Sequence, residues 1–136
     1  MLAIMRLEIF SLAVIGALIF APLQAHAQQI CDLAVGDIEA VRALVLKLPG
    51  AAPAVSRSPD FDVIDAGRGQ LWNFTRPSHP AHPSVACRRL VQKGDQFIVE
   101  TQLECRAAKA QCDRLAADYA RLDKEMQDAL KSAPKR

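Results

Sequence analysis

The most regular hydrophobic pattern of the chain lies near its C-terminus, over residues 107–132. Apolar side chains recur there at alternating spacings of three and four, which predicts one long amphipathic helix. Because the stripe spans only about two and a half heptads, we expect this helix to pack on the protein's own sheet and the protein to be a monomer rather than a dimer. The stripe consists of Cys112, Leu115, Tyr119, Leu122, Met126 and Ala129. Opposite charges four residues apart lie on the other face, at Arg114/Asp118, Arg121/Glu125 and Lys124/Asp128.

A second, shorter helical pattern lies near the start of the region after residue 27, over residues 37–48, and an earlier start near Asp32, with Gly36 inside the helix, is the alternative. Asp37 is a suitable N-cap, because its carboxylate accepts hydrogen bonds from otherwise unpaired N–H groups. The pair Pro49-Gly50 ends the pattern. Its apolar positions are Ile38, Val41, Val45 and Leu48. Residues 49–60 have neither helical nor strand periodicity and predict a surface connection.

Between the two helices, the pattern changes to short apolar runs typical of strands. Residues 61–65 and 70–75 predict two strands, and the glycines between them suit a tight reversal. Trp72 and Phe74 share one face of the second strand, where we expect them to anchor the core. Residues 76–84 contain three prolines and predict a stiff extended loop.

Residues 84–91 and 96–104 predict a hairpin, with a reversal at residues 93–95. A three-residue loop places Cys87 opposite Thr101 and leaves Arg89 on the inner face. A register shifted by one residue would remove Arg89 from the inner face, but it would place Glu100 opposite Cys87. We therefore expect the register in which Cys87 faces Thr101. It gives one inner face made of Val85, Cys87, Val91, Phe97, Val99, Thr101 and Leu103.

These elements predict an α+β fold. It has an N-terminal helix, a small antiparallel meander of about four strands, and a long C-terminal amphipathic helix packed on one sheet face. We expect both helices to cover the face that Phe97, Val99 and Leu103 build. Either Trp72 and Phe74 or Leu71 would complete that face.

The N-terminal segment has the layout of a secretory signal peptide over residues 1–27. Arg6 precedes an apolar run of about 15 residues, and Ala25-His26-Ala27 follows it as a cleavage site. An uncleaved anchor is the alternative, but a spanning helix needs about 20 residues. We therefore expect a single small domain over residues 28–136, periplasmic or secreted, with no membrane association after cleavage. A net charge of +2 argues neither for nor against nucleic acid, but an exported protein seldom meets any, so we expect no nucleic-acid partner.

All four cysteines follow the predicted cleavage site, and an exported protein is expected to pair them in disulfides. In the predicted hairpin, Cys87 and Cys105 lie about 13 Å apart, beyond the roughly 7 Å limit between Cα atoms. We favour Cys31–Cys87 with Cys105–Cys112, the second pair bridging a sharp turn before the helix. The pairing Cys31–Cys105 with Cys87–Cys112 is the other candidate.

Few residues of the chain suggest catalysis or metal chemistry. His79 and His82 form an H-x-x-H pair that can bind a metal, although a catalytic zinc needs three protein ligands and a structural zinc four. The serines lack a nucleophile elbow, and the chain has neither a phosphate-binding loop nor a C-x-x-C motif. The sequence predicts no cofactor.

The function that these exclusions favour is non-enzymatic binding of an unknown envelope protein. Trp72 and Arg76, followed by His79 and His82, form the candidate binding patch, because Trp and Arg are enriched at interface hot spots. A periplasmic metal-handling protein that uses His79 and His82 is the alternative, and a small hydrolase is a third hypothesis.

Overall fold

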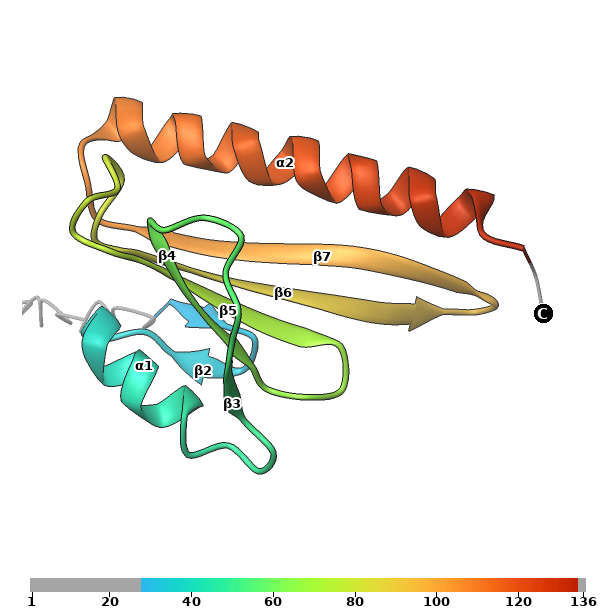
Figure 1. The fold of residues 1–136 in the computed structure, drawn as a ribbon, viewed down its shortest axis with the longest axis horizontal. Coiled ribbons are helices and arrows are strands. Elements are labelled where there is room, and N and C mark those ends of the chain that lie inside the picture. The colour runs from blue at the N-terminus through green and yellow to red at the C-terminus, as the bar shows by residue number, and fades with distance from the viewer. Residues whose placement is uncertain (1–27, 135–136) are drawn as a thin grey trace, which may run out of the picture.

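The computed structural model describes residues 28–134, so the predicted signal peptide lies outside the described residues. Five strands form one antiparallel meander in the order β3-β4-β5-β6-β7, and β1 and β2 pair separately. Figure 1 shows α1 and the β1–β2 pair on one side of the large sheet and α2 along the other. The predicted α+β fold, with its antiparallel sheet and the long C-terminal helix packed on it, is confirmed. The elements are β1 (Gln29–Ile30), β2 (Leu33–Ala34), α1 (Ile38–Val45), β3 (Ala52–Ala54), β4 (Phe61–Asp65), β5 (Gln70–Thr75), β6 (Ser84–Lys93), β7 (Gln96–Cys105) and α2 (Lys109–Ser132).

The large sheet has five strands rather than about four, because residues 52–54 pair with β4. The sequence pattern predicts only a surface connection over residues 49–60, so this strand is a correction. Pro53 lies in its centre and lacks a backbone N–H, which restricts such a strand to the edge of a sheet. A strand of three residues is too short to show an alternation of apolar and polar side chains in the sequence. The two-residue strands β1 and β2 were not predicted for the same reason.

Helix α1 begins where the sequence predicts and ends earlier. The Asp37 carboxylate accepts a hydrogen bond of 3.1 Å from the backbone N–H of Ala40, as expected of an N-cap. The helix ends at Val45, and a turn carries the chain on to Leu48. Its apolar side chains are buried at Ile38, Val41 and Val45.

The predicted register of the β6–β7 hairpin is wrong by one residue. Lys93 pairs with Gln96 and Arg89 with Glu100, so the loop contains only Gly94 and Asp95. Gly94 has a φ of 65°, which the two-residue hairpin turns require at their first position. Arg89 therefore faces a carboxylate at 3.4 Å instead of an apolar side chain, and Lys93 lies 3.0 Å from the same carboxylate. The hydrogen bond from Lys93 lowers the pKa of Glu100 below its ordinary value.

This register divides the hairpin side chains between two covered faces. Val85 and Cys87 lie on the α1 side, in one core with Trp72 and Phe74. Ala86 and Leu103 lie on the α2 side, in a second core with Leu115 and Tyr119. The two helices therefore cover opposite faces, and the expectation of one shared inner face is wrong. The expectation that Trp72 and Phe74 anchor the core is confirmed, with 0% and 2% exposure.

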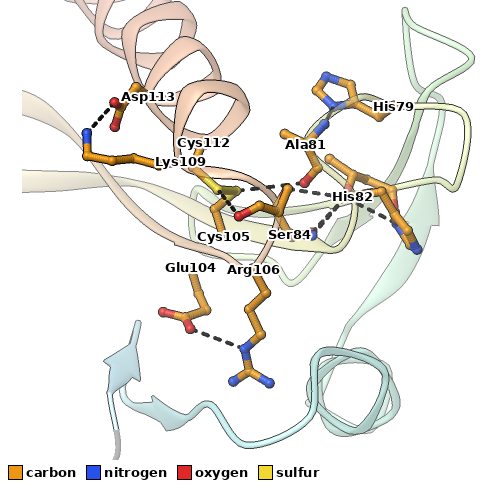
Figure 2. The surroundings of a disulfide bond; sticks show 12 residues. His79, Ala81, His82, Ser84, Glu104, Cys105, Arg106, Lys109, Cys112 and Asp113 are labelled. Carbon is orange, nitrogen blue, oxygen red and sulfur yellow. Dashed lines mark hydrogen bonds and ion pairs between the residues drawn. A yellow bond between two sulfur atoms is a disulfide. The ribbon is translucent and has the colours of Figure 1, made fainter.

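The favoured disulfide pairing is confirmed. Cys31–Cys87 ties the β1–β2 segment to the centre of the sheet, with 6.3 Å between Cα atoms. Cys105–Cys112 has a Cα separation of 5.7 Å and bridges the turn between the last residue of β7 and the first turns of α2 (Figure 2). This is the sharp reversal that such a pairing needs. Within residues 28–134, neither helix is both long and apolar enough to cross a membrane.

Candidate functional site

A groove lies beside α2, on the part of the sheet that this helix leaves open. A helix is about 10–12 Å wide and strands lie about 4.8 Å apart, so one helix covers about two of the five strands. Helix α2 packs along β7 (Figure 1), and the same face of β4 and β5 is only partly covered, with its side chains half-buried and Phe61 in contact with the α2-side core. The resulting cavity has a volume of about 850 Å³. We call it the α2 groove, with a floor of Phe61, Val63, Leu71 and Asn73, an α2 wall of Leu115, Tyr119, Leu122, Met126 and Ala129, and an opposite wall of residues 55–58.

The α2 wall is the apolar stripe that the sequence pattern predicts, but the sheet buries only part of it. Leu115 and Tyr119 are 4% and 7% exposed, whereas Leu122 and Met126 are 37% and 38% exposed. Val55, on the opposite wall, is fully open to solvent. Apolar side chains that converge on a concave surface without a covering element are typical of a binding site.

A smaller cavity of about 310 Å³ continues the groove toward the turn between β4 and β5. Both cavities share Leu71, Arg88 and Met126 as lining residues. The groove therefore extends along the flank of α2 from the loop wall to the turn that carries Arg68.

Arg88 fixes the α2 wall to the sheet. Its guanidinium lies 3.1 Å from the Asp123 carboxylate, and the two side chains are only 15% and 21% exposed. The same guanidinium lies 5.9 Å from the centre of the Tyr119 ring, within cation–π range. Burial raises the pKa of Tyr119 to about 12, and the positive charge of Arg88 offsets a smaller part of that effect. The wall is thus held by a desolvated ion pair rather than by apolar contact alone.

The two rims of the groove differ in charge. On α2, Arg121 pairs with Asp118 at 3.7 Å and with Glu125 at 3.1 Å, so these charges largely satisfy one another. On the other rim, Arg57 and Arg68 are exposed, and neither forms an ion pair with any residue of the described part of the chain. The exposed carboxylate of Asp65 lines the smaller cavity beside Arg68 and forms no ion pair within the described residues either, so this side of the groove presents two guanidinium groups against one carboxylate.

The binding patch predicted around Trp72 does not form as a surface. Trp72 is 0% exposed and lies in the α1-side core, so this part of the hypothesis is wrong. Arg76 is exposed but lies 2.6 Å from the Asp62 carboxylate, whose other oxygen accepts a hydrogen bond from Arg42 at 2.9 Å. Arg76 therefore helps to join the loop after β5 to β4 and α1.

The two histidines brace the loop between β5 and β6. His82 Nδ1 lies 2.9 Å from the Thr75 carbonyl oxygen, and His79 Nδ1 accepts a hydrogen bond of 3.0 Å from the N–H of Ala81. The His79 ring also lies 4.8 Å from the Phe61 ring. Figure 2 shows that the two imidazoles do not point toward one another. Over residues 28–134, the structure brings together no group of three or more side chains able to hold a metal ion.

The hydroxyl groups near His82 serve the same brace. Ser84 is 1% exposed, and its hydroxyl donates to Thr75 Oγ1 at 3.2 Å. Thr75 Oγ1 in turn accepts a hydrogen bond from the N–H of Ser84 at 2.8 Å. His82 Nδ1 lies 2.9 Å from the Thr75 carbonyl oxygen and 3.5 Å from the Thr75 hydroxyl, so its nearer contact joins the loop to β5.

Sequence reasoning missed the groove because it assigned both helices to one face of the sheet. The apolar stripe of α2 predicts one wall of the groove, but no local pattern in the sequence shows which strands this helix leaves only partly covered. Comparisons of the chain with known protein families, with curated proteins and with solved structures found no match.

Proposed function

We propose that this protein is an exported, non-enzymatic interaction module that binds a partner protein in the α2 groove. The observation that carries the proposal is the half-covered apolar face, where Leu122 and Met126 remain over a third exposed beside an open sheet. Exposed apolar surface of this kind costs free energy in water, and burial against a partner recovers about 25 cal/mol per Å².

One feature of the sequence and one feature of the structure support export of the protein. Residues 1–27 have the pattern of a signal peptide, and the two disulfides suit a protein that folds in an oxidising compartment. The partner is therefore expected among envelope or extracellular proteins.

The test captures partners with the full chain, tagged and expressed in the producing cells, from envelope extracts. The variant Leu122→Glu/Met126→Glu places two carboxylates in the groove at positions that already reach solvent. The matched control is Leu44→Glu/Leu46→Glu, at the end of α1 on the other side of the sheet, where both side chains are 48% and 44% exposed. Circular dichroism verifies that each variant is folded.

We expect the wild type and the α1 control to recover the same partner, and the groove variant to recover at least ten-fold less of it. The proposal is wrong if all three forms recover the same proteins equally. It is also wrong if the wild type recovers none and the purified protein instead turns over a substrate.

A further inference from the structure

The next inference rests on the proposed function and concerns the kind of element that the α2 groove binds. Both edges of the large sheet are protected against an added strand. On β3, Pro53 removes a backbone donor from one edge. On β7, the Gln127 side chain accepts a hydrogen bond of 3.1 Å from the N–H of Val99 and donates one of 2.9 Å to the carbonyl of Phe97. A partner strand therefore meets blocked positions at both edges, whereas the face beside α2 is open.

The dimensions of the open face suit one helix. The α2 wall runs from Leu115 to Ala129, which is about 21 Å at 1.5 Å per residue, or about four helical turns. Its side chains recur every three or four residues, the spacing at which two neighbouring helices interlock. The partly covered strands β4 and β5 span about 10 Å, the width of one helix.

A second copy of this chain does not fit the same space. Two sheets facing each other would place the solvent face of each α2 on the apolar floor of the other copy. That face carries the ion pairs Lys109–Asp113 and Lys124–Asp128, whose side chains are more than half exposed. Burying these charges against Phe61, Val63 and Leu71 would cost several kcal/mol per ion.

The charge of the rim indicates which kind of helix from another protein would bind. Arg57 and Arg68 line the groove away from α2 without an ion-pair partner among the described residues, and they outnumber the one unpaired carboxylate there, that of Asp65. A helix in the groove would present one flank to these guanidinium groups, and carboxylates there would complement them. We propose that the groove binds an amphipathic helix of a different protein, with its apolar stripe on the floor and acidic residues along the flank that faces Arg57 and Arg68.

The test is photo-crosslinking in the producing cells. A benzophenone amino acid replaces Val55 or Leu122 in the full chain, and a control chain carries it at Leu44 on α1. Mass spectrometry then identifies the crosslinked segment. We expect the two groove positions to crosslink to one segment of another protein, with apolar residues three and four apart and a net negative charge, and the control position not to crosslink to it.

A charge-reversed variant tests the acidic flank. Arg57→Glu/Arg68→Glu is expected to lower the crosslink yield at least five-fold. Lys47→Glu/Lys131→Glu makes the same change in net charge away from the groove and is expected to leave the yield unchanged.

The inference is overturned if the adduct is a second copy of this chain, a lipid, or a segment without helical periodicity or acidic charge. It also fails if no crosslink forms at the groove positions. If capture depends on Leu122 and Met126 while the crosslinked segment is not an acidic helix, only the identity of the occupant is wrong. If capture does not depend on the groove, the proposed function itself is wrong.

Discussion

Among single residues, Arg88 and Asp123 form the ion pair that joins the groove wall to the sheet. Both side chains are largely buried, so removing one partner leaves a desolvated charge without compensation. We expect Asp123→Asn to lower the free energy of unfolding by about 1–3 kcal/mol, measured by urea denaturation. The matched substitution Asp128→Asn removes a carboxylate that is 54% exposed on the same helix, and its effect should be close to zero. Equal effects of the two substitutions would contradict this account of the wall.

Tyr119 gives a second prediction at this scale. Burial raises its pKa from 10.0 to about 12 in the folded protein, because the uncharged phenol is favoured there. The contribution of this group to stability is therefore complete below pH 10 and is lost as the pH rises from about 10 to about 12. Tyr119 is the only tyrosine of the chain, so absorbance at 295 nm during an alkaline titration follows it alone. A midpoint near 10 in the folded protein would show that the ring is not buried under α2.

At the scale of elements, the two disulfides are expected to contribute unequally to stability. Cys31–Cys87 joins residues 56 positions apart and Cys105–Cys112 residues only 7 apart. The loop-closure entropy lost from the unfolded chain gives roughly 4 kcal/mol for the long loop and roughly 2.5 kcal/mol for the short one. We expect Cys31→Ala/Cys87→Ala to lower the urea midpoint more than Cys105→Ala/Cys112→Ala, with the fluorescence of Trp72 as the probe. The reverse order would mean that the short bridge holds α2 in a way that chain entropy does not describe.

Elements with strong local signals were predictable, and those set by pairing were not. The bounds of β4 and β5 match the prediction, because glycines and prolines delimit them in the sequence. The Asp37 cap and the α2 stripe are likewise local patterns. The β6–β7 register depends on whether Arg89 meets Glu100 or an apolar side chain. That choice follows from having both faces of the sheet covered, which no single strand reveals.

At the scale of the whole molecule, the arrangement of layers determines the site. Because α1 and the β1–β2 pair cover one face, α2 alone remains for the other, and one helix is too narrow for five strands. Strand distances excluded only the pairing of Cys87 with Cys105, and the confirmed pairing was favoured over one other candidate, whereas the open face was not predictable. The open face exists because Trp72 points to the α1 side of the sheet and Leu71 to the α2 side. A one-residue change in strand register would move each of these side chains to the opposite side.

The proposed function requires that a partner covers the α2 groove. Hydroxyl-radical footprinting of the captured complex tests it directly, because Met126 is the only methionine of residues 28–134 and lies on the groove wall. The account predicts that oxidation of Met126 falls several-fold when the partner is bound, while Leu44 on α1 reacts as in the free protein. Unchanged oxidation of Met126 in the complex, with protection at Leu44 instead, would contradict it.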